Sequence, residues 1–257
     1  VIYLRRNTGE TGCLSPNALT VYHEKEDLSM VIPHYLAVTR AEIAGGALPA
    51  HLGYLGCHFS ETGLSGLPEA LPSRSLLILD DRIPMTNQDP ALILSQLQKA
   101  LDAFDCMGLL LDFQQPENGP QRALARVLSE KLELPVAAPP FYAAPECRLF
   151  LPPVPPDRSV EEALSPWSGR KIWLDTTPGA ITLTLTGAGC AAAPLPHSPA
   201  PGRFTDPRLC CRYSIAEIPE GFRFTLFRDE ACLRALLAQA AECGVELAVG
   251  LWQEFRP

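Results

Sequence analysis

Short, continuously apolar segments alternate with longer amphipathic ones along most of the chain. The apolar segments lie at 52–59, 75–79, 108–111, 134–138, 148–151, 171–174 and 245–251. Apolar runs of this length, bounded by polar residues, are typical of strands buried on both faces. Between them, amphipathic segments that begin with a capping residue predict helices at 89–104, 118–132, 159–164 and 229–243. The pattern therefore predicts repeated strand–helix–strand units.

Such repeats predict a parallel sheet, which is either an open doubly wound sheet or a closed barrel. The length of 257 residues is close to the roughly 250 residues usual for an eight-stranded barrel. Polar or aromatic residues follow most of the predicted strands. In a barrel all of these strand ends meet on one face, whereas an open sheet gathers its ligands at one switch point. The sequence also lacks the glycine-rich motifs that cradle nucleotide phosphates. We therefore predict an α/β fold of the (β/α)8 TIM-type barrel class.

We expect a single domain over residues 1–257, irregular at its N-terminus and carrying an inserted β-containing segment at about 178–227. Up to about residue 50, β-branched and aromatic residues gather at 1–6, 18–23 and 30–39 without a clear repeat. In the insertion, alternating Leu and Thr at 181–186 predict a half-exposed strand, and 222–227 predict a second β segment. Residues 187–207 are rich in Ala, Pro and Gly, and we expect a long surface excursion there.

Charge and cysteine content exclude several classes of function. The formal net charge is −8, which argues against a nucleic-acid binder, since phosphate neutralisation needs clustered Lys and Arg. No apolar run reaches the ~18 residues of a membrane span. The nine cysteines form no CxxC pair, so a zinc site has little support and a reduced, cytoplasmic setting is expected. We expect no cofactor and no metal, and the oligomeric state is left open.

The polar residues that follow the predicted strands form one candidate site. It comprises Asp80, Asp81, Asp112, Gln114, Glu117, Tyr142, Asp175, Trp252 and Glu254. Several carboxylates beside an aromatic side chain suit a sugar ligand, because aromatic faces stack on sugar rings and polar groups bond to the hydroxyls. Paired carboxylates are also what glycoside hydrolysis uses. The site residues therefore predict a carbohydrate ligand.

One of these strand ends resembles a known family. The segment 104–114 reads Phe-Asp-Cys-Met-Gly-Leu-Leu-Leu-Asp-Phe-Gln. It is similar to the fourth-strand motif D-G-x-D-x-D-x-E of family 18 glycoside hydrolases, the chitinase-like barrels. The resemblance implies that Asp112 orients the N-acetyl group of the substrate and that Gln114 stands where the family has its acid/base glutamate. Leu110 falls on the middle aspartate of the motif, and Gly108 on its glycine.

The C-terminal part resembles the same family. Phe-Arg-Asp-Glu at 227–230, the helix that follows and a strand ending in Leu251-Trp252 are similar to the family's seventh-helix and eighth-strand region. The resemblance implies that Trp252 floors the sugar site, and that the β segment before this helix corresponds to a small inserted subdomain. It covers roughly 75–255, while the first 70 residues show no match.

The departure from the motif decides the expected activity. The amide of Gln114 does not ionise, so it cannot donate the proton that the family mechanism needs at the glycosidic oxygen. Leu110 stands where the family motif has a second carboxylate. The like charge that would shift the pKa of the neighbouring carboxyls is therefore also missing. The first hypothesis is therefore a degenerate chitinase-like barrel that binds N-acetylated glycan with little or no hydrolysis, and it predicts that Trp252→Ala abolishes binding.

Two alternatives stay open. The chain could be an active glycosidase that uses relocated carboxylates, drawn from Glu117, Glu254 and Asp80 and also Asp112 and Asp175. It could also be a non-catalytic interaction or scaffold protein, since barrels host many functions. Each site residue has a structural interpretation as well: an aspartate after a strand can turn the chain or cap a helix, and an aromatic residue there can be ordinary packing.

Overall fold

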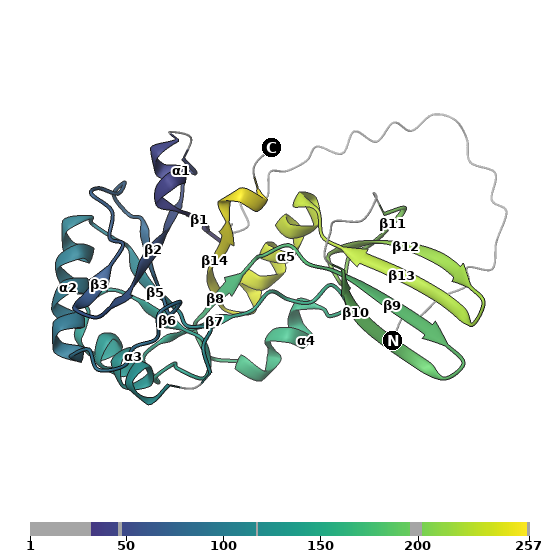
Figure 1. Cartoon of the computed structure of the whole chain (residues 1–257). Helices are drawn as coiled ribbons and strands as arrows, with labels where there is room; N and C mark the ends of the chain where they lie inside the picture. The colour runs from purple at the N-terminus through teal and green to yellow at the C-terminus, as the bar shows by residue number, and fades with distance from the viewer. Residues whose placement is uncertain (1–31, 46–47, 117, 196–201, 256–257) are drawn as a thin grey trace.

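The computed structural model describes residues 32–45, 48–116, 118–195 and 202–255. Figure 1 shows a barrel with helices around it and a second sheet that projects from one side. The β segments predicted at 1–6 and 18–23 lie outside the described residues, whereas the one at 30–39 contains the first described strand.

In the described part of the chain, eight parallel strands form the barrel. They are β1 (His34–Val38), β2 (Leu52–Ser60), β4 (Leu76–Asp80), β5 (Gly108–Asp112), β6 (Val136–Ala138), β7 (Arg148–Leu151), β8 (Ile172–Asp175) and β14 (Val245–Leu251). Neighbours in this order pair in parallel, and β1 closes the ring because it pairs with both β2 and β14. The short β3 (Gly63–Ser65) adds an antiparallel strand to β2. The predicted barrel is thus confirmed, and the open sheet is wrong.

The three long helices begin where their capping residues predict. They are α2 (Pro90–Ala103), α3 (Gly119–Lys131) and α5 (Glu230–Glu242). The side chains of Asp89, Asn118 and Asp229 each accept a hydrogen bond from a backbone N–H of the first helical turn, which satisfies donors that the helix leaves unpaired. The other helices are short: α1 (Arg40–Ala44), α4 (Val160–Leu164), and the 3-10 turns η1 (Ser165–Trp167) and η2 (Trp252–Glu254).

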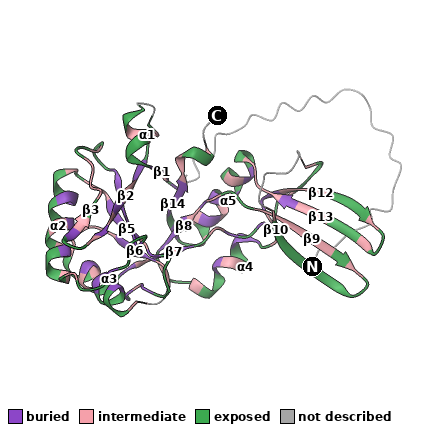
Figure 2. Cartoon of the chain, in the orientation of Figure 1, coloured by how far each residue is buried: buried purple, intermediate pink, exposed green. Residues whose placement is uncertain are grey.

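The strands are buried on both faces, as their continuous apolar runs predict. One core fills the barrel and includes Ile78, Leu110 and Trp173. A second lies between the strands and the helices, where alternate residues such as Leu79 and Leu111 meet α2 and α3. Figure 2 shows the buried residues concentrated in the barrel and its helices. The barrel interior is therefore a packed core, and ligands can reach only its ends.

The segment between β8 and α5 forms an antiparallel sheet of five strands. These are β9 (Ala180–Thr186), β10 (Gly189–Leu195), β11 (Phe204–Asp206), β12 (Cys211–Ile218) and β13 (Gly221–Phe227), in the spatial order β10-β9-β13-β12-β11. The described residues of 187–207 lie at the surface as predicted, but 189–195 and 204–206 are strands, which the prediction missed. Cross-strand pairing overrode composition there, because β10 pairs along its full length with β9.

Candidate functional site

Three aspartates stand at the same rim of the barrel. Asp80, Asp112 and Asp175 are the last residues of β4, β5 and β8. Because the strands are parallel, their carboxyl ends lie at one face, and Asp80 is directly in register with Asp112. The apolar runs that precede these residues place them there, since each run ends at the point where the strand leaves the core. This face is where (β/α)8 barrels carry their active sites.

A cavity of about 200 Å³ opens at this rim. Its polar lining consists of Asp112, Gln114, Asp175 and Thr177, and its remaining lining is apolar, with Ala37, Leu55, Ile78, Leu110, Phe150, Val249, Gly250 and Leu251. We call it the mouth cavity. An apolar floor with a few polar groups at one side is typical of small-molecule sites.

Asp112 and Gln114 are bonded to each other at the edge of the mouth cavity. The Gln114 Nε2 donates to the Asp112 Oδ1 at 2.5 Å. Burial raises the pKa of Asp112 above its ordinary value, the nearby Asp175, Asp80 and Asp81 carboxylates raise it further, and the bond from Gln114 works against the rise. The carboxyl at the centre of the site therefore holds its proton more tightly than a carboxyl in water.

This raised pKa predicts how stability responds to pH. Above its pKa in the folded protein, Asp112 is ionised in both the folded and the unfolded state. The folded state is then destabilised by the burial of this charge and by its repulsion from the neighbouring carboxylates. Below the ordinary pKa of 3.8 it is neutral in both, and the cost disappears. Asp112→Asn should therefore raise the midpoint of thermal unfolding by a few degrees at pH 7. The gain should shrink as the pH falls toward 4. A gain that is the same at both pH values would contradict the raised pKa.

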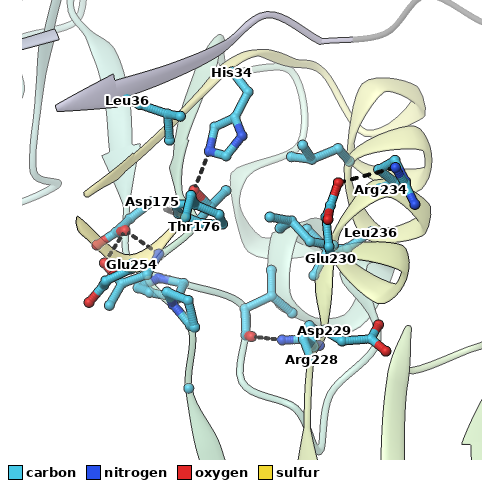
Figure 3. A pocket seen from close by; sticks show the side chains of 18 residues that line it. His34, Leu36, Asp175, Thr176, Arg228, Asp229, Glu230, Arg234, Leu236 and Glu254 are labelled. Carbon is cyan, nitrogen blue, oxygen red and sulfur yellow. Dashed lines mark hydrogen bonds and ion pairs between the residues drawn. The ribbon is translucent and has the colours of Figure 1, made fainter. Parts of the chain in front are cut away.

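A larger cavity of about 660 Å³ adjoins the mouth cavity, and Asp175 and Thr177 line both. Figure 3 shows this side cavity between β1, the end of β8, η2 and α5, with Asp175 and Glu254 on one wall and the α5 side chains opposite. Asp175 accepts hydrogen bonds from the backbone N–H and the hydroxyl of Thr177, both at 2.7 Å. The two cavities therefore share part of their lining at the end of β8.

Of the four carboxyls of described residues that line the side cavity, Glu254 and Asp175 have raised pKa values. Burial raises the pKa of Glu254, and the charge of Asp175 raises it further. Burial also raises the pKa of Asp175, although its bonds from Thr177 and Thr176 oppose the rise. Carboxyls with raised pKa values in a cleft are suited to donating protons or to binding neutral hydroxyl-bearing ligands.

His34 lines the side cavity in a defined tautomer. The hydroxyl of Thr176 donates its hydrogen to the Val249 carbonyl at 3.0 Å. Because a hydroxyl has only one hydrogen, the His34 Nε2, 2.8 Å from that oxygen, must be the donor of their bond. Burial lowers the pKa of His34, and His51 lowers it further. The ring is therefore held neutral, with its Nε2 protonated.

The two neighbouring aspartates after β4 have different surroundings. Asp80 pairs with Arg82, whose Nε and Nη2 donate to its two oxygens at 2.7 and 2.5 Å. Asp81 is buried and accepts from the backbone N–H groups of Gln114 and Gln115, at 2.8 and 3.0 Å. It also accepts from the Gln121 Nε2 at 3.1 Å. Asp81 therefore fixes the segment that carries Gln114 and lies outside the cavity lining.

The two aromatic residues predicted for the site also lie outside the mouth cavity. Tyr142 is buried edge-to-face against Phe113, with ring centroids 5.3 Å apart, and its hydroxyl shares its one hydrogen between the carbonyl oxygens of Gln115 and Pro116, each 2.9 Å away. Trp252 packs against the outer core, and its neighbour Leu251 lines the cavity. Side chains alternate between the two faces along β14. An assignment that is wrong by one residue therefore exchanges the side chains that face the cavity with those that face away from it.

Some site residues were not predicted, and one prediction falls outside the described chain. His34, Thr177 and Leu251 line the cavities without having been singled out, although Thr176-Thr177 directly follow Asp175 and so carry the same strand-end signal. Glu117 lies outside the described residues.

Among the residues that are described, no group of three or more His, Cys, Asp or Glu side chains is arranged to hold a metal ion. Over the same residues, no helix is long and apolar enough to cross a membrane.

Comparison with known proteins rests on structure. No family model matches the sequence, and no curated protein matches it. A solved structure of chitinase ChiW from Paenibacillus sp. FPU-7 superposes with a TM-score of 0.59 at 11% identity, over 87% of this chain and 42% of that one. A chitinase from Chromobacterium violaceum gives 0.51 at 9% identity, over 85% and 93% of the two chains. The chain shares the barrel fold of these chitinases.

The spore cortex-lytic enzyme SleL of Bacillus megaterium has the same fold. It superposes with a TM-score of 0.51 at 10% identity, over 86% of this chain and 70% of that one. The fold thus agrees with the resemblance to a glycoside-hydrolase-like barrel. At identities this low the agreement concerns the fold alone, so the activity has to be argued from the residues of the site.

Proposed function

We propose that this chitinase-like barrel binds an N-acetylated glycan at its mouth and hydrolyses it little or not at all. The observation that carries the proposal is the bonded pair of Asp112 and Gln114 at the edge of the mouth cavity. Asp112 supplies the carboxyl that can hold an amide group of the ligand. Gln114 occupies the adjacent position with a group that cannot give up a proton.

The shape of the site favours a sugar chain. Ligand pockets commonly measure roughly 300–1,000 Å³, so the mouth cavity of about 200 Å³ is small by itself. The adjoining side cavity of about 660 Å³ extends it along the rim. The apolar floor, with Leu110 and Leu251, suits the C–H faces of a sugar ring. Asp175 and Thr177 at the junction can bond to its hydroxyls.

Binding can be tested by calorimetric titration of chito-oligosaccharides into the whole chain, with mass spectrometry of the sugars after long incubation. We expect binding without shortening of the sugars. Leu251→Arg should abolish binding, because it places a long charged side chain in the mouth cavity. Trp252→Ala is the companion variant: loss of binding there would mean that Trp252 also contacts the ligand. If chito-oligosaccharides do not bind at all, the proposal fails and a scaffold role is favoured.

An active glycosidase is the second candidate, favoured by one observation. Asp175 and Glu254 line the side cavity, and the pKa of each is raised. Of the other relocated carboxylates predicted, Asp80 is paired with Arg82. Shortening of sugars that is lost in Glu254→Gln, but kept in Glu246→Gln on the outside of the barrel, would support this candidate over the binding protein.

A further inference from the structure

The inserted sheet has one apolar and one polar face. Residues directly opposite each other in antiparallel strands share a face, and the register aligns Leu185 with Phe222, Leu183 with Phe224, and Phe224 with Ile215. The intervening residues on β9 and β13 are Thr182, Thr184, Arg223 and Thr225, which lie on the other face. The apolar face carries Ile181, Leu183, Leu185, Phe204, Tyr213, Ile215, Phe222, Phe224 and Leu226. Leu226 is buried at the barrel end of the sheet.

Much of this apolar face is open to water. Leu185, Phe204, Ile215 and Phe222 are 44–48% exposed, and they come from four adjacent strands. Phe204 and Tyr213 stack with ring centroids 5.3 Å apart, so the apolar surface continues to the β11 edge. Figure 2 shows the sheet standing off the barrel with exposed and intermediate residues along its length. Contiguous exposed apolar patches of this kind mark interaction sites.

The charges identify the kind of partner. Among the described residues of this face, the charged ones are Glu217, which pairs with Phe222 near the far end, and Asp206, which pairs with Cys211 at the barrel end. Asp206 already accepts from the N–H groups of Arg208 and Leu209. The centre of the face is uncharged, so a second copy of the same face meets it without like-charge repulsion. A two-fold interface needs this self-complementarity.

The size of the face also suits a second copy. With strands ~4.8 Å apart and ~3.3 Å per residue, four strands of seven or eight residues and the three-residue β11 cover roughly 450–500 Å² in projection. The relief of the side chains adds to that area. A standard interface buries about 800 Å² of accessible surface on each partner. Two such sheets can pack face to face about 10 Å apart, as in a β-sandwich.

We propose that the chain forms a homodimer in which the apolar faces of two inserted sheets pack against each other about a two-fold axis. Each protomer then covers the exposed Leu185, Ile215 and Phe222 of the other. The interface uses none of the residues that line the mouth cavity, because those belong to the barrel strands and the segments after them.

Sedimentation equilibrium of the whole chain over a range of concentrations tests the proposal. We expect a dimer, and we expect Leu185→Lys/Phe222→Lys to raise its dissociation constant about a hundredfold or more, because four like charges then face each other. The matched control is Thr182→Lys/Thr225→Lys, a directly paired couple on the other face of the same two strands. The control should dimerise as the unmodified chain does.

A milder pair keeps the test decisive if the lysine variant unfolds. The double variant Leu185→Thr/Phe222→Thr introduces threonine, the residue type common on the polar face, which is well tolerated in strands. It should raise the dissociation constant of the dimer about tenfold, because less apolar surface is buried. Circular dichroism checks that each variant is folded. A monomer at every concentration overturns the proposal, as does a folded lysine or threonine variant that dimerises unchanged. Equal weakening in the control overturns it too, because the interface would then lie elsewhere.

Discussion

Gln114→Glu is expected to raise the hydrolysis of chito-oligosaccharides by about 10²-fold or more, the contribution typical of a positioned general acid. The substitution changes an amide to a carboxyl of the same length, 2.5 Å from the Asp112 oxygen in the present arrangement. Two carboxyls at that distance share a proton, since both cannot ionise together. One of them is therefore protonated near neutral pH and can donate to the glycosidic oxygen. Release of reducing ends, followed by mass spectrometry, measures the gain.

The control for this variant is Gln114→Met, which has similar length and no proton to give. It should show no gain. Adding Asp112→Asn to Gln114→Glu should remove most of the gained activity, because it removes the charge that raises the pKa of the new acid. If Gln114→Glu hydrolyses no faster than Gln114→Met, the absence of an acid is not what separates this site from an active one, and the proposed explanation is wrong.

Asp81→Ala is expected to lower the free energy of unfolding by about 3 kcal/mol or more. Asp81 is buried and accepts three hydrogen bonds, two from the backbone N–H groups of Gln114 and Gln115 and one from the Gln121 side chain. Each buried donor left without a partner costs about 1–3 kcal/mol. Urea unfolding followed by circular dichroism measures the loss.

The adjacent residue provides a matched control. Asp80→Ala removes a pair with Arg82 in which the Arg82 side chain is 55% exposed and the Asp80 side chain 10% exposed, together with one bond from the Arg82 backbone N–H. The donors left behind all belong to Arg82, whose side chain reaches solvent, so we expect a smaller loss of about 1–2 kcal/mol. The two alanine variants therefore differ only in which aspartate of the pair is lost. Equal destabilisation would contradict the anchoring role of Asp81. Asp81→Ala should also weaken glycan binding, since Gln114 loses the contact that holds its backbone.

The sequence predicted the barrel well because its signals are local. Continuous apolar runs that end in Asp80, Asp112 and Asp175 mark both the strands and the rim, and capping residues such as Asp89 mark the helices. The inserted sheet was harder to predict, because β10 contains three Ala, a Gly and a Pro and owes its structure to pairing with β9. A strand of that composition has no local signature, so only the partner strand reveals it.

Prediction of individual site residues was limited by side-chain direction. Asp112 and Gln114 do meet at the mouth cavity, as their place at and just after the end of β5 predicts. Whether Leu251 or Trp252 faces the cavity depends on an assignment exact to one residue. The periodicity of the sequence does not give that precision at the end of a strand. The backbone N–H groups of Gln114 and Gln115 donate hydrogen bonds to Asp81, which follows a different strand. These bonds depend on tertiary structure and cannot be predicted from spacing along the chain.

The closure of the barrel by β1 has a consequence for synthesis of the chain. His34 in β1 pairs with Ala248 in β14, so the ring cannot be completed until the last of its strands has left the ribosome. Until then β1 and β8 each present an unpaired edge, and such edges invite association with other chains. Contacts of such large sequence separation also slow folding. A nascent chain of this protein therefore depends on protection of the β1 edge for most of its time in translation, and of the β8 edge once β8 has been made.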